Sequence, residues 1–143
     1  MTDQAITDRP FTVASFQAYM NEGKLMGSRS RETGEIFVPP RPIDPHTHGD
    51  DMEWVELSGR GTLAAFTSVY IGTSAMIDAG YDRAKPYVAA IVELEEGPRI
   101  SAQLLGVNGT APDIDWIGRS LEATFIERGQ EKRRTYLAFE MTP

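Results

Sequence analysis

The sequence predicts a mainly β protein, in which a five-stranded barrel of the OB type follows an N-terminal helix. The stretch Trp54–Tyr70 begins with alternating apolar and polar residues and continues as an apolar run rich in strand formers. Glycines on both sides of Arg60 interrupt it, as expected where one long strand bulges and coils to serve two edges of a small barrel. Four more strand-like segments follow, and a long connection separates the third strand from the fourth. This layout is typical of OB barrels.

The four later strands are expected at residues 87–94, 99–105, 119–126 and 135–141. The first of these is a continuous apolar run suited to a central strand, and the other three alternate apolar and polar residues. Residues 72–85 connect the Trp54–Tyr70 strand to the first of them. Connections of this length are usually functional, so we expect this loop to carry a role.

A short amphipathic helix is expected from Thr12, after an N-terminal arm at residues 1–10. Thr12 has the side chain of an N-cap residue, and Gly23 fits the position just after a helix end. Two interpretations of the helix's apolar stripe remain open: it packs on the protein's own barrel, or it docks on a partner. The stripe consists of Val13, Phe16, Tyr19 and Met20.

Residues 24–53 are the least regular part of the chain. Short strands at 25–29 and 35–38, joined by a turn at Thr33–Gly34, would form a knuckle-like hairpin. Four prolines after residue 38 exclude a helix interior or a central strand there. These are Pro39, Pro40, Pro42 and Pro45.

Composition limits the classes of function. The chain has 143 residues, a formal net charge of -7 and no cysteine. The acidic balance would repel a polyanion, so nucleic-acid binding is not expected, and the basic run Lys132–Arg134 is interpreted as a solvated hairpin tip. The absence of cysteine leaves no disulfide framework and no thiolate metal site. No apolar run is long enough for a membrane span and no signal peptide is visible, so a cytoplasmic location is expected.

The most site-like motif is His46-Thr47-His48, which is followed by several carboxylates. Two imidazoles two residues apart can hold a metal, but a catalytic metal normally has three protein ligands in a defined geometry. The motifs that begin this way need a further histidine, and the chain has two histidines in all. No serine lies in a strand-turn-helix elbow either. No self-sufficient catalytic site is therefore predicted.

Three runs, at residues 58–67, 85–100 and 115–125, resemble the OB domain of the acyl-CoA-associated zinc-ribbon/OB-fold family, domain of unknown function family thirty-five. The leading helix and the run Val38-Pro39-Pro40-Arg41 also match, so the resemblance covers nearly the whole chain. The resemblance implies an arm and helix at residues 1–27, a zinc-ribbon knuckle at 28–53 and an OB domain at 54–143.

The knuckle departs from the family pattern. Family members usually carry two Cys-x-x-Cys pairs that bind zinc, and alignment on Pro39–Arg41 and Gly34 puts other residues in their place. Hydroxyls are poor zinc ligands at neutral pH and one carboxylate cannot hold the ion alone, so a metal-free knuckle is expected. Without the metal we expect residues 28–50 to be loose in isolation and ordered in a complex. The four degenerate positions are Ser30, Thr33, Asp44 and Thr47.

The resemblance implies a non-catalytic subunit of a thiolase-superfamily enzyme, of the acyltransferase or aldolase type. Such a subunit shapes the partner's acyl-CoA entrance or bridges two acyl-CoA enzymes. No cofactor is expected on this chain alone, but coenzyme A is expected at the partner interface, with its phosphates on Arg29, Arg31 and Arg41. Two alternatives stay open, a free-standing oligonucleotide-binding protein and a small metal enzyme using His46 and His48. The residues expected to bind the partner are Phe16, Tyr19, Met20, Met76, Ile77, Tyr81 and Arg83.

Overall fold

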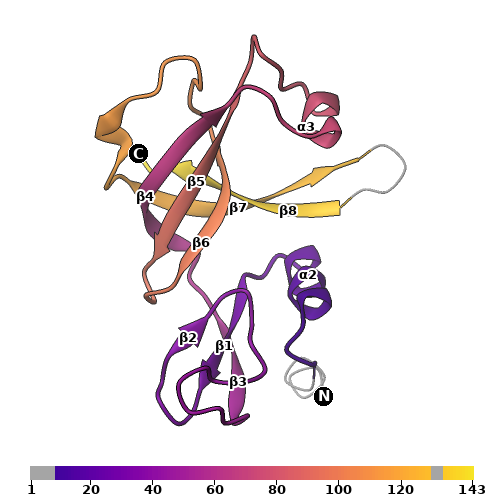
Figure 1. The fold of residues 1–143 in the computed structure, drawn as a ribbon, viewed down its shortest axis with the longest axis vertical. Coiled ribbons are helices and arrows are strands. Elements are labelled where there is room, and N and C mark those ends of the chain that lie inside the picture. Colours follow the sequence, from indigo (N-terminus) through magenta and orange to yellow (C-terminus); the bar gives the residue numbers. More distant parts are fainter. Residues whose placement is uncertain (1–8, 130–133) are drawn as a thin grey trace. The chain divides into compact units, whose positions relative to one another are not determined.

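The structure is a computed structural model that describes residues 9–129 and 134–143. Its contacts divide the chain into two compact units. The N-terminal unit runs to Ser58 and includes Glu96–Pro98; the barrel unit consists of Gly59–Glu95 and Arg99–Pro143. Most of the predicted N-terminal arm and most of the basic run Lys132–Arg134 lie outside the described residues. Figure 1 shows the elements of both units.

The N-terminal unit consists of one helix and a three-stranded antiparallel sheet. Helix α2 spans Val13–Asn21, and the strands are β1 (Met26–Ser30), β2 (Ile36–Phe37) and β3 (Met52–Glu56). The strand order is β2-β1-β3, with both pairs antiparallel. The predicted knuckle hairpin is therefore present as β1 and β2, and a third strand that the sequence had assigned to the barrel completes the sheet.

Helix α2 begins and ends where the sequence predicted. The Thr12 hydroxyl accepts a hydrogen bond from the backbone N–H of Ser15 at 3.2 Å, which caps the first turn. After the last turn, Gly23 takes a φ of 81°, a conformation that favours glycine.

The apolar stripe of α2 is buried inside the N-terminal unit. Phe16, Tyr19 and Met20 are all buried, and the Tyr19 ring lies 4.8 Å from the Trp54 ring of β3. The helix also packs on β1. The prediction that these three residues face a partner was therefore wrong, because they form part of this unit's own core; Val13 is the stripe residue that stays exposed.

The barrel unit is the five-stranded OB barrel that the sequence predicted. Its strands are β4 (Arg60–Val69), β5 (Tyr87–Leu94), β6 (Arg99–Leu105), β7 (Ser120–Arg128) and β8 (Arg134–Met141). The barrel closes in the order β4-β5-β6-β8-β7, with one parallel pairing between β6 and β8. Two short helices lie in the connections, α3 (Ser74–Asp78) and the 3-10 turn η1 (Ile114–Trp116).

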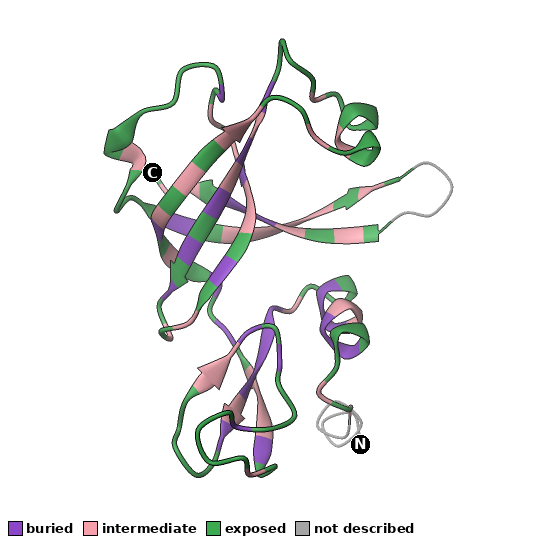
Figure 2. Cartoon of the chain, viewed as in Figure 1, coloured by how far each residue is buried: buried purple, intermediate pink, exposed green. Residues whose placement is uncertain are grey.

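Side chains that alternate inward along the strands fill the barrel. Figure 2 shows buried positions alternating with exposed ones along β5. The largest fully buried side chains of the unit come from four of the five strands. They are Leu63, Val88, Val92, Leu121 and Phe139.

The stretch Trp54–Tyr70 is not one strand, which corrects the prediction. Residues 57–59 separate β3, which pairs with β1, from β4, which pairs with β5 and β7. The boundary between the units thus falls after Ser58, whereas the sequence placed it before Trp54. The irregularity in β4 lies between Leu63 and Ala65, and not at the glycines.

The two glycines beside Arg60 serve other purposes. Gly59 turns the chain between the strands with a φ of 79°. Gly61 allows β4 to approach β5, because a Cβ atom there would lie 2.4 Å from the backbone oxygen of Glu93. Glycine is therefore required at both positions, once for the backbone angle and once for space.

Every helix in the described ranges is too short and too polar to traverse a lipid bilayer.

Candidate functional site

A groove of about 830 Å³ lies in the barrel unit where the β4–β5 connection meets β7 and β8. In OB barrels the loops between the first and second strands and between the fourth and fifth strands border the ligand-binding face. The groove therefore occupies the position at which this fold usually binds its ligands. It is lined by Thr73, Ala75, Met76, Asp78 and Ala79 on one side, and by Glu127, Arg128, Gly129, Arg134 and Tyr136 on the other.

Local sequence positions the first wall. The Thr73 hydroxyl accepts a hydrogen bond from the backbone N–H of Met76 at 3.4 Å and caps α3. The same helix presents Ile77 to solvent, with 57% of that residue exposed. One turn of helix thus holds a methionine in the groove and an isoleucine beside it, where the sequence analysis expected partner-binding residues.

Arg128 joins the two walls. Its Nη1 lies 3.4 Å from the sulfur of Met76, and its guanidinium carbon lies 5.6 Å from the centre of the Tyr81 ring. The rings of Tyr81 and Tyr87 pack edge to face, with their centres 5.8 Å apart. Arg128 was missed from the sequence because the expected strand ended at residue 126. Arg83, which was predicted, is exposed but does not line the groove.

The composition of the groove suits binding. Among its described lining residues there is no imidazole or thiol that could act as a nucleophile or form a nucleophile–base pair. Methionine side chains adapt to a partner's surface, and tyrosine and arginine are enriched at protein interfaces. The arrangement can therefore hold an apolar segment with polar groups at its rim.

The knuckle of the N-terminal unit contains a second cluster, which we call the Asp44 network. The Asp44 carboxylate is fully buried; its Oδ2 accepts the Thr33 hydroxyl at 2.8 Å and its Oδ1 accepts the backbone N–H of His46 at 2.8 Å. Hydrogen bonding to the Ser30 hydroxyl, followed by the bond from His46, lowers the pKa of Asp44 to about 2. The Asp44 network thus comprises Asp44, Ser30, Thr33 and the N–H of His46.

Three of the four degenerate zinc positions meet in this network. The fourth, Thr47, accepts a hydrogen bond from the backbone N–H of Gly49 at 3.1 Å in the same loop. Ser30, Thr33 and Asp44 each stand where the family pattern has a zinc-binding cysteine. Here the hydroxyls of Ser30 and Thr33 donate hydrogen bonds to the Asp44 carboxylate. These side chains do not fit a zinc ion, since none is a soft ligand and the carboxylate is already engaged.

The structure places a carboxylate beside His46, the first histidine of the predicted pair with His48. The Nε2 of His46 lies 2.9 Å from a carboxylate oxygen of Glu35. Within residues 9–129 and 134–143, the potential ligand atoms of Glu35, Asp44 and His46 lie within 4.8 Å of one another, and His48 is not part of that group. This group of possible ligands therefore contains one of the two predicted histidines.

Two of the three arginines predicted to bind coenzyme A are engaged in ion pairs. Arg29 and Glu53 face each other across β1 and β3, with Nε to Oε1 at 2.8 Å. Arg31 donates to Glu53 at 3.0 Å and to Asp51 at 3.1 Å. These contacts, with that of Arg31 the largest, lower the pKa of Glu53. Both arginines therefore fasten the hairpin to β3.

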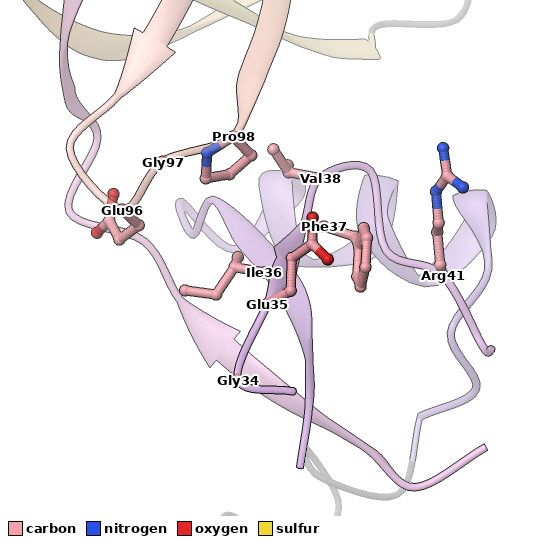
Figure 3. A pocket seen from close by; sticks show the side chains of 9 residues that line it. All are labelled: Gly34, Glu35, Ile36, Phe37, Val38, Arg41, Glu96, Gly97 and Pro98. Carbon is pink, nitrogen blue, oxygen red and sulfur yellow. The ribbon is translucent and has the colours of Figure 1, made fainter. Parts of the chain in front are cut away.

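Arg41 has different surroundings. Its guanidinium lies 5.5 Å from the centre of the Phe37 ring, and it lines a pocket of about 420 Å³ (Figure 3). Glu35 and Glu96 line the same pocket. With two carboxylates and one guanidinium in its lining, the pocket has a negative balance, which opposes a phosphate group.

Comparison with known proteins decides the family. Residues 54–125, half of the chain, match the family model described as the C-terminal OB-fold domain of ChsH2. A DUF35 domain-containing scaffold protein of Methanothermobacter thermautotrophicus is 31% identical over 121 residues, which are 84% of this chain and 85% of the relative. This chain belongs to the DUF35 family. The scaffold protein of Methanocaldococcus jannaschii is 32% identical over 71% of this chain and 67% of its own length.

Other relatives are named for enzymes. The benzoylsuccinyl-CoA thiolase subunit BbsA of Thauera aromatica is 34% identical over 60% of this chain and 55% of its own. Among solved structures, a chain of the Ltp2-ChsH2(DUF35) aldolase matches with a TM-score of 0.72 and 25% identity, covering 90% of this chain and 92% of that one. A DUF35 protein of unknown function from Sulfolobus solfataricus, at 19% identity and a TM-score of 0.59, shares the fold.

Proposed function

We propose that this DUF35 protein is a non-catalytic accessory subunit of a thiolase-superfamily enzyme that forms or cleaves C–C bonds in acyl-CoA substrates. Its relatives include scaffold proteins and subunits of benzoylsuccinyl-CoA thiolase. The Ltp2-ChsH2 aldolase contains a chain with the same fold over 90% of this one. The subunit shapes the partner's acyl-CoA entrance, or bridges the partner to a second acyl-CoA enzyme.

The observation that carries the partner site is the groove bordered by α3, β7 and β8. It combines the ligand-binding position of an OB barrel with an adaptable lining of Met76, Tyr136 and Arg128. Of these, Tyr136 is 40% exposed, and Ile77 beside the groove is 57% exposed. A partner segment that covers these side chains would bury apolar surface that the barrel leaves in water.

The proposed benefit to the partner is physical. A second protein surface at a substrate entrance can order the acyl-CoA chain and exclude water from the partner's catalytic residues. Both effects need a rigid support, and a closed barrel provides one because it has no free sheet edges to rearrange.

Co-purification followed by reconstitution tests the proposal. The tagged chain, expressed in its native host, should retain a thiolase-superfamily protein in stoichiometric amount, identified by mass spectrometry. Binding of that purified protein is then measured for Met76→Asp and for Val13→Asp, a matched control at a residue of α2 that is 73% exposed. We expect Met76→Asp to weaken binding at least tenfold, about 1.4 kcal/mol.

Two results would contradict the proposal. One is recovery of no thiolase-superfamily protein from the native host. The other is equal binding by the two variants once circular dichroism has shown that both are folded, which would remove the groove from the interface. A shift of single-stranded DNA or RNA in a gel would instead favour the oligonucleotide-binding alternative, which the net charge of -7 opposes.

Coenzyme A is proposed at the partner interface and not on this chain alone. Arg41 is the remaining candidate of the three predicted arginines, because Arg29 and Arg31 pair with Glu53; the partner would have to offset the negative balance of the pocket that Arg41 lines. In the reconstituted complex, Arg41→Ala should raise the KM for acyl-CoA, whereas Arg31→Ala should not. An unchanged KM for Arg41→Ala would exclude the contact.

The proposal includes a cytoplasmic location. A chain with no cysteine carries no disulfides of the kind that secreted domains often use. Fractionation of the native host, probed for the chain and for its partner, would test this.

A further inference from the structure

The Asp44 network joins the same two turns that the zinc ion of a zinc ribbon would join. The first turn follows β1, where the backbone N–H of Gly34 donates to Ser30 at 2.7 Å. The second follows the proline-rich run, where the N–H of His48 donates to the backbone oxygen of Asp44 at 2.8 Å. Ser30 and Thr33 belong to the first turn, and Asp44 and His46 to the second. The carboxylate therefore connects two segments that the sheet pairing leaves unconnected.

The donors that surround Asp44 match what a carboxylate needs. An ionised carboxylate offers about four acceptor sites and no donor. Three donors reach it, the two hydroxyls of Ser30 and Thr33 and the N–H of His46. Hydrogen bonds to a charged acceptor are roughly twice as strong as neutral ones. A buried carboxylate with this set of donors is satisfied, so it can replace the bonds that a metal would make.

We propose that the Asp44 carboxylate takes the place of the metal in this knuckle, so that the subunit folds independently of zinc. The inference goes beyond the proposed function, since it concerns how the N-terminal unit is held and not what the barrel unit binds. The competing arrangement is a cation held by Glu35, Asp44 and His46, whose ligand atoms lie within 4.8 Å of one another. The experiments below separate the two.

The first experiment uses the wild-type chain, purified without chelator. Elemental analysis should find no stoichiometric metal, and EDTA should leave the Tm unchanged. Titration with ZnCl2 or CoCl2 in a calorimeter should show no saturable site. A stoichiometric metal, a Tm lowered by EDTA, or a saturable site that His46→Ala abolishes would overturn the proposal in favour of the cation.

The second experiment compares Asp44→Asn with Asp50→Asn, which makes the same chemical change at an exposed aspartate six residues away. Asparagine cannot accept all three donors, so we expect the Tm to fall by roughly 5–15 °C at position 44 and to stay near the wild-type value at position 50. If Asp44→Asn does not fold, Thr33→Val and Thr33→Ser take its place. Valine should lower the Tm and serine should retain it, because serine keeps the hydroxyl donor. Equal Tm values within either pair would overturn the proposal.

A third experiment asks whether the carboxylate stands at the metal's position. Ser30→Cys, Thr33→Cys, Asp44→Cys and Thr47→Cys are combined in one variant, which restores four thiolates. We expect this variant to bind one Co2+ with thiolate-to-cobalt absorption and to lose its structure in EDTA. A variant that binds no cobalt, whether folded or not, would overturn the assignment.

Discussion

The barrel and the three-stranded sheet are both antiparallel β structure, yet they are held together differently. In the barrel unit the fully buried side chains are apolar, with Leu63, Val92 and Phe139 at 1% exposure or less. In the N-terminal unit the fully buried side chains are Tyr19 and three polar ones, Asp44, Ser28 and Ser30. The barrel depends on apolar packing, whereas the N-terminal unit adds a few buried directional bonds to its apolar core, so the two should respond differently to acid and to substitution.

Each unit contains one of the chain's two tryptophans, so the comparison can be measured. Trp54 packs on Phe11 and Tyr19 in the N-terminal unit, and Trp116 packs on Phe66 in the barrel unit. Replacing one tryptophan by phenylalanine leaves fluorescence that reports on the other unit.

The largest effect is expected from Phe139→Ala. This ring is fully buried in β8, so its removal leaves a cavity and should lower the free energy of unfolding of the barrel by about 3–5 kcal/mol. The Trp116 signal, followed in urea, should show it. Tyr136→Ala, at a 40% exposed position of the same strand, is the control. Equal losses for the two variants would mean that the barrel does not depend on its apolar core.

A smaller loss of stability is expected where strands β4 and β5 approach each other closely. Gly61→Ala places a Cβ 2.4 Å from the backbone oxygen of Glu93, so β4 must move and stability should fall by roughly 1–3 kcal/mol. Arg60→Ala removes an exposed ion pair to Glu95 and should cost less than about 1 kcal/mol. Chemical denaturation followed at Trp116 compares them. A costlier Arg60→Ala would show that charge and not close approach governs this crossing.

Acid should affect the N-terminal unit through Asp44. Its pKa falls from an ordinary 3.8 to about 2 in the folded protein, so it stabilises the fold above about pH 4 and loses this effect as the pH falls through about 2. The Trp54 transition should therefore weaken across this window. The Asp44→Asn variant should lose less stability in acid than the wild type. Part of the loss that remains comes from Glu53, whose pKa is also lowered in the folded protein. Identical acid profiles for the two proteins would remove Asp44 as the cause.

The smallest effect is expected from Glu53→Gln. Glu53 pairs with Arg29 and Arg31, whose side chains are 42% and 56% exposed, so water and salt screen much of the attraction. We expect a Tm decrease well below that of Asp44→Asn, and a decrease that shrinks further in 1 M NaCl. Glu56→Gln, at an exposed residue of the same strand, serves as the control. A loss that salt does not reduce would indicate a structural role beyond charge.

The barrel could be predicted from the sequence because strand periodicity is local. The expected segments 87–94 and 99–105 coincide with β5 and β6, since each carries its own inward and outward residues. Which strands pair is not local. Trp54 and Phe66 lie on strands of different sheets, and nothing in the alternation of that stretch marks the change at Ser58.

The same limit explains the site residues that the sequence misplaced. An apolar helical stripe shows that Phe16 and Tyr19 are covered, but not which surface covers them. Asp44 was recognised as unsuitable for zinc, yet its role depends on the hydroxyls of Thr33 and Ser30, which lie eleven and fourteen residues earlier in the chain. Met76 was predicted from the length of its loop; Arg128, 52 residues away, became visible only when the fold brought the two together.

The parallel contact between β6 and β8 has a consequence for biosynthesis. The three strands of the N-terminal sheet are complete once Glu56 has left the ribosome, whereas closure of the barrel waits for residues 138–140 of β8 to reach Gln103–Leu105. A nascent chain stalled between these points would carry a finished sheet and up to four strands of an open barrel, and the inner faces of β5 and β6, once made, would lie in water. Chaperones bind exposed apolar strands of this kind. A chain that terminates early should therefore keep the N-terminal sheet and lack a folded barrel.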